Sequence, residues 1–285
     1  SPFTGTFDGN NYIISNLTIG DSSSYKGLFG YTSEEAEIVD VGLQNVDITN
    51  AYQYIGSLVG WNNGTITNCY ATGNITGNYY TGGLVGYNNG TITNSYATGS
   101  VTGYNEYTGG LVGSNGGTIT NCYATGNITG NWDTGGLVGE NYGTITDCYA
   151  TGSVEGDYYT GGLVGDNRSI IKNCYATGKV TGNNRTGGLV GRNDETLTNC
   201  YATGEVTGDS ETGGLVGYNK KGSITNCYAT GEVTGYSSTG GLVGRNDDTI
   251  TNSYYNSETT GQINNGIGTS LTTAQLIKMA LWNST

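Results

Sequence analysis

One motif, G-x-L-V-G, recurs along most of this 285-residue chain. Successive copies are 26 or 27 residues apart, with a divergent copy, GLFG, at Leu28. The leucines of the regular copies are Leu58, Leu84, Leu111, Leu137, Leu163, Leu189, Leu215 and Leu242. Because near-identical units at a fixed period must meet their neighbours in near-identical ways, the repeat predicts a stack of units and not a layered globule.

The segments between the markers predict strands. Each repeat reads GLVG, TITN, CYATG and VTG in turn, with runs too short for helices and with Gly and Asn as turn residues. One such unit cannot close a core, but stacked units bury a continuous one. The predicted fold class is therefore all-β, a single-chain β-solenoid (parallel β-helix) with coils of about 26 residues. We expect one domain over 1–285, with divergent N-terminal coils in 1–55, regular repeats in 56–254 and a C-terminal cap in 255–285.

The cap is predicted from the sequence TTAQLIKMALW. Thr272 is a candidate N-cap for a short amphipathic helix, with Leu276, Met279 and Leu281 on roughly one side. We expect this helix to cover the last coil, because an uncovered coil exposes strand edges that recruit another copy.

Equivalent positions of successive coils should form columns about 4.8 Å apart. Columns that begin at Leu58, Ile66, Ile75 and Ala71 are the predicted core. Two Asn columns, one from Asn62 to Asn246 and one from Asn68 to Asn252, are predicted to stack their amides as ladders.

The cysteines share one column, in which Ser95 and Ser253 take two places. Its cysteines are Cys69, Cys122, Cys148, Cys174, Cys200 and Cys227. A disulfide needs Cβ atoms about 3.8 Å apart and turned toward each other, which stacked neighbours with parallel side chains do not provide. We predict buried free thiols, and no metal site, since the chain has no His and no CxxC pair.

A tyrosine follows each of these column members, from Tyr70 to Tyr254. Strict alternation would bury it, whereas a bend at the preceding Asn would place Cys and Ala inside and Tyr outside. We favour the bend. An exposed row of tyrosines would be a large patch of the kind that mediates lateral association.

The charge balance limits the partners. Lys and Arg number 10 against 23 Asp and Glu, a net charge of −13. This charge repels phosphate backbones and anionic membrane surfaces, and no apolar run reaches the length of a membrane span. We therefore expect no nucleic-acid partner and no membrane insertion. The start at Ser1, within strand-like sequence, indicates a mature protein or a piece of a longer exported one.

Aromatic residues gather in the turn before each TGG. The candidate binding residues are Tyr79, Tyr80, Tyr104, Tyr107, Trp132, Tyr158 and Tyr159. Aromatics along one edge would offer flat, amphipathic faces to sugar rings or protein partners. The alternative is that Tyr is simply a good neighbour in strands and turns.

Other activities have weaker support. Paired threonines (T-x-T) resemble the arrays of ice-binding solenoids, but Ile170 and Lys172 interrupt them. Acidic residues are scattered over turns without a recurring Arg or Lys, so a polysaccharide-active enzyme is disfavoured and no catalytic residue is assigned. No cofactor is expected, and Ca²⁺ lacks a D-x-D-x-D loop to bind it. Lys179 over Glu205 and Asp166 over Arg192 are predicted ion pairs between coils.

The G-x-L-V-G-x-N units followed by N-C-Y-A-T-G resemble the GLUG-motif repeats of prokaryotic surface proteins and adhesins. The opening FTGTFDGNNYIISNLTI and the closing SYYNSETTGQ with LTTAQL are also similar to the ends of such arrays. The resemblance implies export and an extracellular or cell-surface location. It carries over no catalytic residue, because the motif marks turns and core.

Sequons would permit glycosylation in a host that performs it, although Asn-Gly-Thr is partly forced by the repeat. The candidate acceptors are Asn16, Asn63, Asn74, Asn89, Asn127, Asn167, Asn184 and Asn283.

Two functional hypotheses remain. In the first, the chain is a non-catalytic adhesive or structural surface protein whose aromatic-rich turns contact glycans or a protein. In the second, it is the self-assembling subunit of an extracellular fibre or sheath. A capped, monomeric solenoid favours the first, and open ends or an exposed tyrosine row favour the second.

Overall fold

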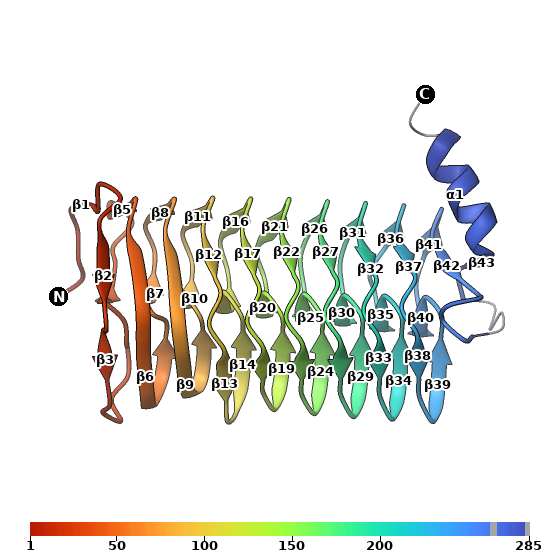
Figure 1. Ribbon diagram of the computed structural model, residues 1–285, viewed down its shortest axis with the longest axis horizontal. Helices are drawn as coiled ribbons and strands as arrows, with labels where there is room; N and C mark the ends of the chain where they lie inside the picture. The colour runs from red at the N-terminus through yellow and green to blue at the C-terminus, as the bar shows by residue number, and fades with distance from the viewer. Residues whose placement is uncertain (263–266, 283–285) are drawn as a thin grey trace.

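The computed structural model describes residues 1–262 and 267–282, with side chains as far as Lys278. The chain winds into an elongated parallel β-solenoid that runs from the N-terminal to the C-terminal end (Figure 1). The predicted fold class is confirmed. Each turn contributes strands to three faces, and the strands pair in parallel with their equivalents in neighbouring turns.

The T-x-T strands form the first face. In spatial order they are β1 (Thr6–Asp8), β5 (Glu37–Val39), β8 (Thr65–Thr67), β11 (Thr91–Thr93), β16 (Thr118–Thr120), β21 (Thr144–Thr146), β26 (Ile171–Lys172), β31 (Leu197–Thr198), β36 (Ile224–Thr225) and β41 (Ile250–Thr251).

The V-G-x-N strands form the second face. They are β4 (Phe29–Tyr31), β7 (Val59–Asn62), β10 (Val85–Asn88), β15 (Val112–Asn115), β20 (Val138–Asn141), β25 (Val164–Asn167), β30 (Val190–Asn193), β35 (Val216–Asn219) and β40 (Val243–Asn246).

The third face begins with β2 (Ile13–Ser15), β3 (Thr18–Ile19), β6 (Gly42–Ile55) and β9 (Tyr70–Gly82), and then has three short strands per turn. The short strands are β12 (Tyr96–Ala97), β13 (Val101–Gly103), β14 (Glu106–Gly109), β17 (Tyr123–Ala124), β18 (Ile128–Thr129), β19 (Trp132–Gly135), β22 (Tyr149–Ala150), β23 (Val154–Glu155), β24 (Tyr158–Gly161), β27 (Tyr175–Ala176), β28 (Val180–Thr181), β29 (Asn184–Gly187), β32 (Tyr201–Ala202), β33 (Val206–Thr207), β34 (Ser210–Gly213), β37 (Tyr228–Ala229), β38 (Val233–Thr234) and β39 (Ser237–Gly240). The face ends with β42 (Tyr254–Asn256) and β43 (Thr269–Leu271).

The register is that of the sequence repeat. Val85 pairs with Val112, Ile92 with Ile119 and Tyr96 with Tyr123. The Leu, Ile, Val and Ala columns are buried, except that Ile250 at the last turn is partly buried, which confirms the predicted core. The Asn62 column is buried as far as Asn219, and its amides bond from turn to turn, as predicted.

The predicted bend is confirmed at the Asn68 column, whose Asn and Asp residues have φ between 46° and 55°. Asn and Asp tolerate this left-handed conformation better than other non-glycine residues. The bend changes which side chains point inward. The Cys and the Ala of N-C-Y-A are buried, and the Tyr between them is half-exposed.

The cysteines are free and buried, as predicted. Each thiol takes part in the same hydrogen bonds: Cys148 Sγ donates to the carbonyl of Thr146 at 3.1 Å and accepts from the amide of Cys122 at 3.3 Å. Ser95 makes the equivalent bonds, to the Thr93 carbonyl at 2.8 Å and from the Cys69 amide at 3.0 Å. A hydroxyl and a thiol are therefore interchangeable in this column.

Aromatic residues cover the core at both ends. Phe29 contacts Phe3 and Phe7 at the N-terminal end, with ring centroids 4.8 and 5.3 Å apart. At the C-terminal end Tyr255 is fully buried in the column of Ala229, and Ile267 packs beside it against the core.

Helix α1 (Thr273–Trp282) follows β43. Its predicted N-cap is confirmed, since Thr272 Oγ1 accepts from the amide of Gln275 at 3.3 Å and Gln275 Oε1 accepts from the amide of Thr272 at 2.8 Å. The predicted cover differs: α1 rises past the edge of the last turn (Figure 1), and Ile277 is exposed. Leu276 is half-buried, and the side chains of Met279 and Leu281 lie outside the described residues.

Candidate binding strip

Two columns change from turn to turn while the rest of the repeat stays nearly constant. The first is the residue immediately before each TGG or its equivalent: Tyr25, Tyr54, Tyr80, Tyr107, Asp133, Tyr159, Arg185, Glu211 and Ser238. The second is the variable residue of L-V-G-x-N or its equivalent: Tyr31, Trp61, Tyr87, Ser114, Glu140, Asp166, Arg192, Tyr218 and Arg245.

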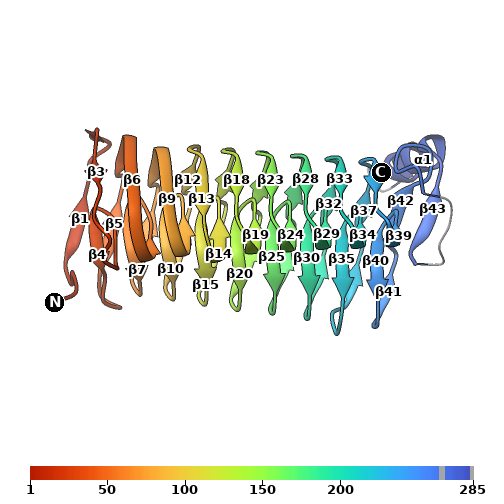
Figure 2. The same ribbon diagram turned by 90° about the horizontal axis from the view of Figure 1, so that it is seen from below.

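The fold brings these two columns together. They lie on neighbouring rows of strands, β14 to β39 and β15 to β40, which run side by side along the molecule (Figure 2). Their side chains interleave: the ring of Tyr54 is 4.9 Å from that of Trp61 and 6.3 Å from that of Tyr87. Arg185 likewise lies 5.1 Å over Tyr218 of the second column. We call the combined surface the variable strip.

The backbone of the first column is costly for its residues. All nine have φ between 49° and 66°. A non-glycine residue in this left-handed region costs roughly 1–2 kcal/mol, and only Asn and Asp reduce that cost locally. Tyr80, Arg185 and Glu211 thus occupy positions where Gly would be cheaper, unlike the Asn and Asp of the Asn68 column. Backbone strain of this kind is common at functional sites, so it favours a functional role for the side chains of this column.

The N-terminal part of the strip is aromatic. Ring centroids in the first column are 4.9 Å apart from Tyr25 to Tyr54, 4.8 Å from Tyr54 to Tyr80 and 4.7 Å from Tyr80 to Tyr107. The second column adds Trp61, 4.4 Å from Tyr87. Four turns therefore supply one continuous file of rings.

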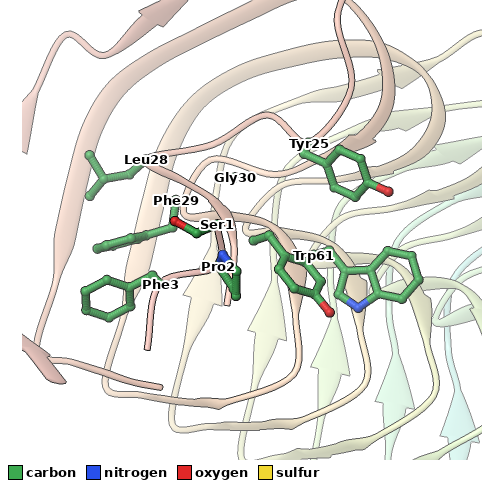
Figure 3. A pocket seen from close by; sticks show the side chains of 9 residues that line it. Ser1, Pro2, Phe3, Tyr25, Leu28, Phe29, Gly30 and Trp61 are labelled. Atoms are coloured by element: carbon green, nitrogen blue, oxygen red, sulfur yellow. The ribbon is translucent and has the colours of Figure 1, made fainter. Parts of the chain in front are cut away.

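This file opens into a hollow of about 790 Å³ at the N-terminal end. Its lining consists of Ser1, Pro2, Phe3, Tyr25, Leu28, Phe29, Gly30, Tyr31 and Trp61. Figure 3 shows the rings of Tyr25 and Trp61 on one side and those of Phe3 and Phe29 on the other. A hollow lined by aromatic rings with a few polar atoms is a common form of ligand site.

The middle of the strip is acidic and buried. Asp133, Glu140 and Asp166 are 7%, 4% and 0% exposed. Arg168 covers two of them, with Nη2 3.3 Å from Glu140 and 3.0 Å from Asp166, and Arg192 lies 3.5 Å from Asp166. Burial raises the pKa of Asp133 to about 8, with further contributions from the charges of Asp166 and Glu140.

The C-terminal part of the strip is basic but paired. Arg185 bonds Glu211 at 2.6 Å and Arg192 bonds Asp194 at 2.5 Å. Arg245 lies 3.2 Å from Glu211 and 3.0 Å from Asp247. The positive charges of this part are therefore largely compensated within it.

The predicted aromatic edge lies partly inside and partly outside the strip. Tyr80, Tyr107 and Tyr159 belong to the strip and are half-buried. Trp132 and Tyr158 stack on each other at 4.4 Å one column further out, and both are exposed.

Two further members of the predicted edge lie apart from the strip. Tyr79 lies in the same outer column as Trp132 and Tyr158, and its ring centroid is 5.7 Å from that of Tyr52. Tyr104 is exposed in the turn before β14. Of the seven predicted residues, the structure thus brings three into the strip.

Sequence reasoning missed Trp61, Tyr87, Asp133 and Glu140 as site residues. The signal was present: they occupy the two positions that vary within an otherwise constant repeat. The two predicted ion pairs between coils are confirmed, Lys179 to Glu205 at 2.8 Å and Asp166 to Arg192 at 3.5 Å.

The tyrosine column forms a second exposed feature. From Tyr70 to Tyr228 its rings stack nearly parallel, with centroids 4.6 to 5.1 Å apart. The side chains are half-exposed, and Tyr228 is the most exposed of those seven. We call this row the tyrosine ridge.

The sequons differ in access. Asn167 is fully buried and donates to Asn193 within the amide ladder, so its prediction as a glycosylation site is wrong for the folded chain. Asn63 and Asn184 are half-buried, and Asn283 lies outside the described residues. The other candidates are exposed and stay predictions: Asn16, Asn74, Asn89 and Asn127.

In the part of the chain that the structure describes, no group of three or more His, Cys, Asp or Glu residues is arranged to hold a metal ion. No helix among these residues is long and apolar enough to cross a membrane.

Known proteins that are similar to the chain include halomucin and a protein from Bacteroides ovatus. The chain is 40% identical to halomucin of Haloquadratum walsbyi (strain DSM 16790 / HBSQ001) over 77 residues, which are 27% of this chain and 1% of halomucin. The chain also aligns with the crystal structure of a Bacteroides ovatus protein proposed to be an immunoglobulin A1 protease. The alignment covers 98% of this chain and 72% of the Bacteroides chain. Its sequence is 20% identical and its TM-score is 0.42.

The family model described as the GLUG motif matches seven consecutive segments of the chain: residues 51–76, 77–102, 104–129, 130–155, 156–181, 182–207 and 208–234. These segments coincide with successive turns of the solenoid and make up more than half of the sequence. The chain therefore belongs to the GLUG-motif repeat family.

Proposed function

We propose that this chain is a non-catalytic, extracellular or cell-surface repeat module that binds a glycan along the variable strip. Membership of the GLUG family and the similarity to halomucin, by its name a mucin, support a surface role. The observation that carries the glycan proposal is the file of half-buried rings from Tyr25 to Tyr107.

These rings have the chemistry that sugars need. A tyrosine offers a flat apolar face to the C–H face of a sugar and a hydroxyl to its polar rim. The rings of Tyr80 and Tyr107 are held by left-handed backbone and by their neighbours, so little freedom is lost on binding.

The shape of the file favours a linear polymer. One ring is supplied per turn, and turns repeat about every 4.8 Å along a straight axis. An extended chain of sugars matches this arrangement better than a compact ligand. The net charge of −13 disfavours anionic polysaccharides.

The test is binding to a glycan array, followed by calorimetry on the oligosaccharides that bind. Tyr80→Ala with Tyr107→Ala should weaken binding roughly tenfold or more, because two stacking faces are lost. Tyr123→Ala with Tyr149→Ala, in the tyrosine ridge, is the matched control and should bind like the parent. Equal losses in both pairs, or no glycan bound by the parent, would overturn the proposal.

A second candidate is the subunit of a fibre or sheath. In the chain as described, β1 and β41 end the first sheet and β4 and β40 end the second, each with one strand neighbour in its sheet. Such edges can pair with another copy in register. Light scattering with electron microscopy over a concentration series tests this, and a monomer throughout the series would exclude it.

A further inference from the structure

We infer that the variable strip selects a glycan whose sugars carry free, protonated amino groups, and that Asp133, Glu140 and Asp166 receive the ammonium. The inference rests on the proposed glycan-binding function and names the class of sugar that the same strip takes. Four observations on the acidic segment support this inference. They are its position beside the rings, two buried carboxyl oxygens without a partner among the described residues, the partly exposed Arg168 that covers it, and the protonated state of Asp133.

The three carboxylates share one place in the strip. Asp133 belongs to the first column, and Glu140 and Asp166 are its two neighbours in the second. The backbone of Asp133 lies against Gly139 and Gly165, where an added Cβ would meet Asp133 atoms at 2.7 and 2.6 Å. The charges of Asp166 and Glu140 accordingly act on Asp133.

These carboxylates also lie next to the row of stacked rings that ends at Tyr107. Tyr107, the last ring of the file, precedes Asp133 in the first column and has Glu140 as its neighbour in the second. Burial raises the pKa of Tyr107, and the nearby charge of Glu140 raises it further. A sugar stacked on Tyr107 would therefore have a neighbouring sugar over the carboxylates.

Some buried carboxyl oxygens of the acidic segment receive no hydrogen bond from the described residues. Among the described residues, the buried Oδ1 atoms of Asp133 and Asp166 have no hydrogen-bond partner. Arg168 contacts Glu140 and Asp166, and Arg192 contacts Asp166 and Asp194, so that none of these ion pairs of the described residues includes Asp133. Because buried carboxylates are normally paired with cations or donors, a cationic donor is the group that this segment fits.

The rest of the strip does not have this deficit. Arg185 and Arg245 each contact Glu211, and Arg245 also contacts Asp247. Among the described residues of the strip, the carboxyl without a cationic partner is therefore Asp133, which lies next to the rings.

Arg168 covers part of the segment. Its side chain is 38% exposed, lies 5.0 Å over the ring of Tyr142 and donates to the Tyr142 hydroxyl. Rotation of this long side chain toward solvent would uncover Glu140 and Asp166. An ammonium from the ligand would then take the place of the guanidinium.

Binding should also displace a proton. Asp133, with its pKa raised to about 8 by burial and by Asp166 and Glu140, is largely protonated at neutral pH; Arg168 opposes this shift and Glu106 adds to it. An ammonium beside Asp133 favours the ionised carboxylate. Uptake of the ligand near pH 7 should therefore release a proton, which calorimetry in two buffers of different ionisation enthalpy detects.

The test compares three probes on the full chain: a glucosamine oligomer, an N-acetylglucosamine oligomer of the same length and an oligolysine. We expect the glucosamine oligomer to bind roughly tenfold more tightly than the acetylated one, the effect of a charge-assisted hydrogen bond. Asp133→Asn and Glu140→Gln should each reduce this preference. Glu155→Gln, an exposed acid outside the strip, changes the charge equally and should leave the preference intact.

Arg168→Gln provides a test that a purely structural role would not pass. Removal of the competing guanidinium should tighten binding of the glucosamine oligomer several-fold and leave the acetylated oligomer unaffected. Weaker binding of both oligomers to this folded variant would contradict the inference.

The outcomes separate the two proposals. Equal binding of both sugar oligomers overturns the amino-sugar inference and leaves the glycan proposal intact. If the chain binds neither sugar oligomer and no other glycan, the amino-sugar inference and the glycan proposal are both overturned. Oligolysine binding as tightly as the glucosamine oligomer would show a general cation site and would also overturn the inference.

Discussion

Asn141 Nδ2 donates a hydrogen bond to Asn167 Oδ1 at 2.8 Å, and both side chains are fully buried. The same bond joins every pair of turns from Asn62 to Asn246, at 2.7 to 2.9 Å. Each amide also holds its own turn, since Asn141 Nδ2 donates to the Gly143 carbonyl at 2.8 Å. The ladder thus satisfies turn carbonyls that lie away from solvent.

Asn141→Ala should lower the free energy of unfolding by about 2–5 kcal/mol, because it leaves Asn115 Nδ2, Asn167 Oδ1 and the Gly143 carbonyl with lost partners. Urea unfolding followed by circular dichroism measures the change. Asn89→Ala, which removes an exposed amide, is the control and should change stability by less than about 0.5 kcal/mol. Similar effects of the two substitutions would mean that the ladder is not a principal stabilising element.

Replacement of all six cysteines by serine should preserve the fold. Ser95 and Ser253 already accept from the neighbouring amide and donate to the carbonyl two residues earlier. In the parent chain, burial raises the pKa of the Cys69 thiol to about 11, so this thiol should not react with a thiol reagent until the chain unfolds. Rapid labelling of native thiols, or loss of the β-sheet spectrum in the serine variant, would contradict this account.

Thr160→Val should stabilise the chain by about 1 kcal/mol. Among the described residues, the buried Oγ1 of Thr160 has no hydrogen-bond partner, like those of Thr134 and Thr186 in the same column. Valine has nearly the same shape, so the substitution removes an unsatisfied group without leaving a cavity. Thermal melts measure the shift, with the half-exposed Thr146→Val as a comparison that should be close to neutral. A lower melting temperature for Thr160→Val would show that its hydroxyl is satisfied in solution.

Stability should fall as the pH rises from about 4 toward 8. The pKa of Asp133 is raised from 3.8 to about 8 by burial and the neighbouring Asp166 and Glu140, so in this window the native state holds a proton that the unfolded chain has lost. Burial raises the pKa of Glu140 and of Asp166 as well, which acts in the same direction. Carboxyls with a lowered pKa, such as Asp247, act below this window.

The measurement is urea unfolding at pH 5, 6, 7 and 8. Asp133→Asn should flatten the profile relative to the parent, because the amide cannot titrate. A parent chain that becomes more stable with rising pH, or a variant with an unchanged slope, would contradict the raised pKa.

The columns of the fold could be predicted because a strict period fixes which residues stack. The Cys column shows this well: its free thiols follow from parallel neighbours, and its two serines confirm the hydrogen bonds. The bend at Asn68 was also predictable, because Asn tolerates the left-handed backbone.

The strip was not predictable in the same way. Whether Asp133 meets Glu140 depends on the shape of the turn between β19 and β20, and a period along the chain does not specify that cross-section. Tyr79 and Tyr80 are adjacent in sequence, yet Tyr80 joins the strip while Tyr79 faces Tyr52. Because adjacent side chains of a strand point in different directions, only some residues of the predicted aromatic edge belong to the strip.

Because neighbouring turns meet through the same hydrogen-bonded columns, a whole unit such as residues 130–155 can be lost or duplicated without any new type of contact in the core. Each such event shortens or lengthens the variable strip and changes the order of its side chains. Unequal recombination between the DNA segments that encode these repeats would therefore produce folded chains with different surfaces in one step. Diversity of recognition in this architecture can arise from copy number and order, with no point substitution in the scaffold.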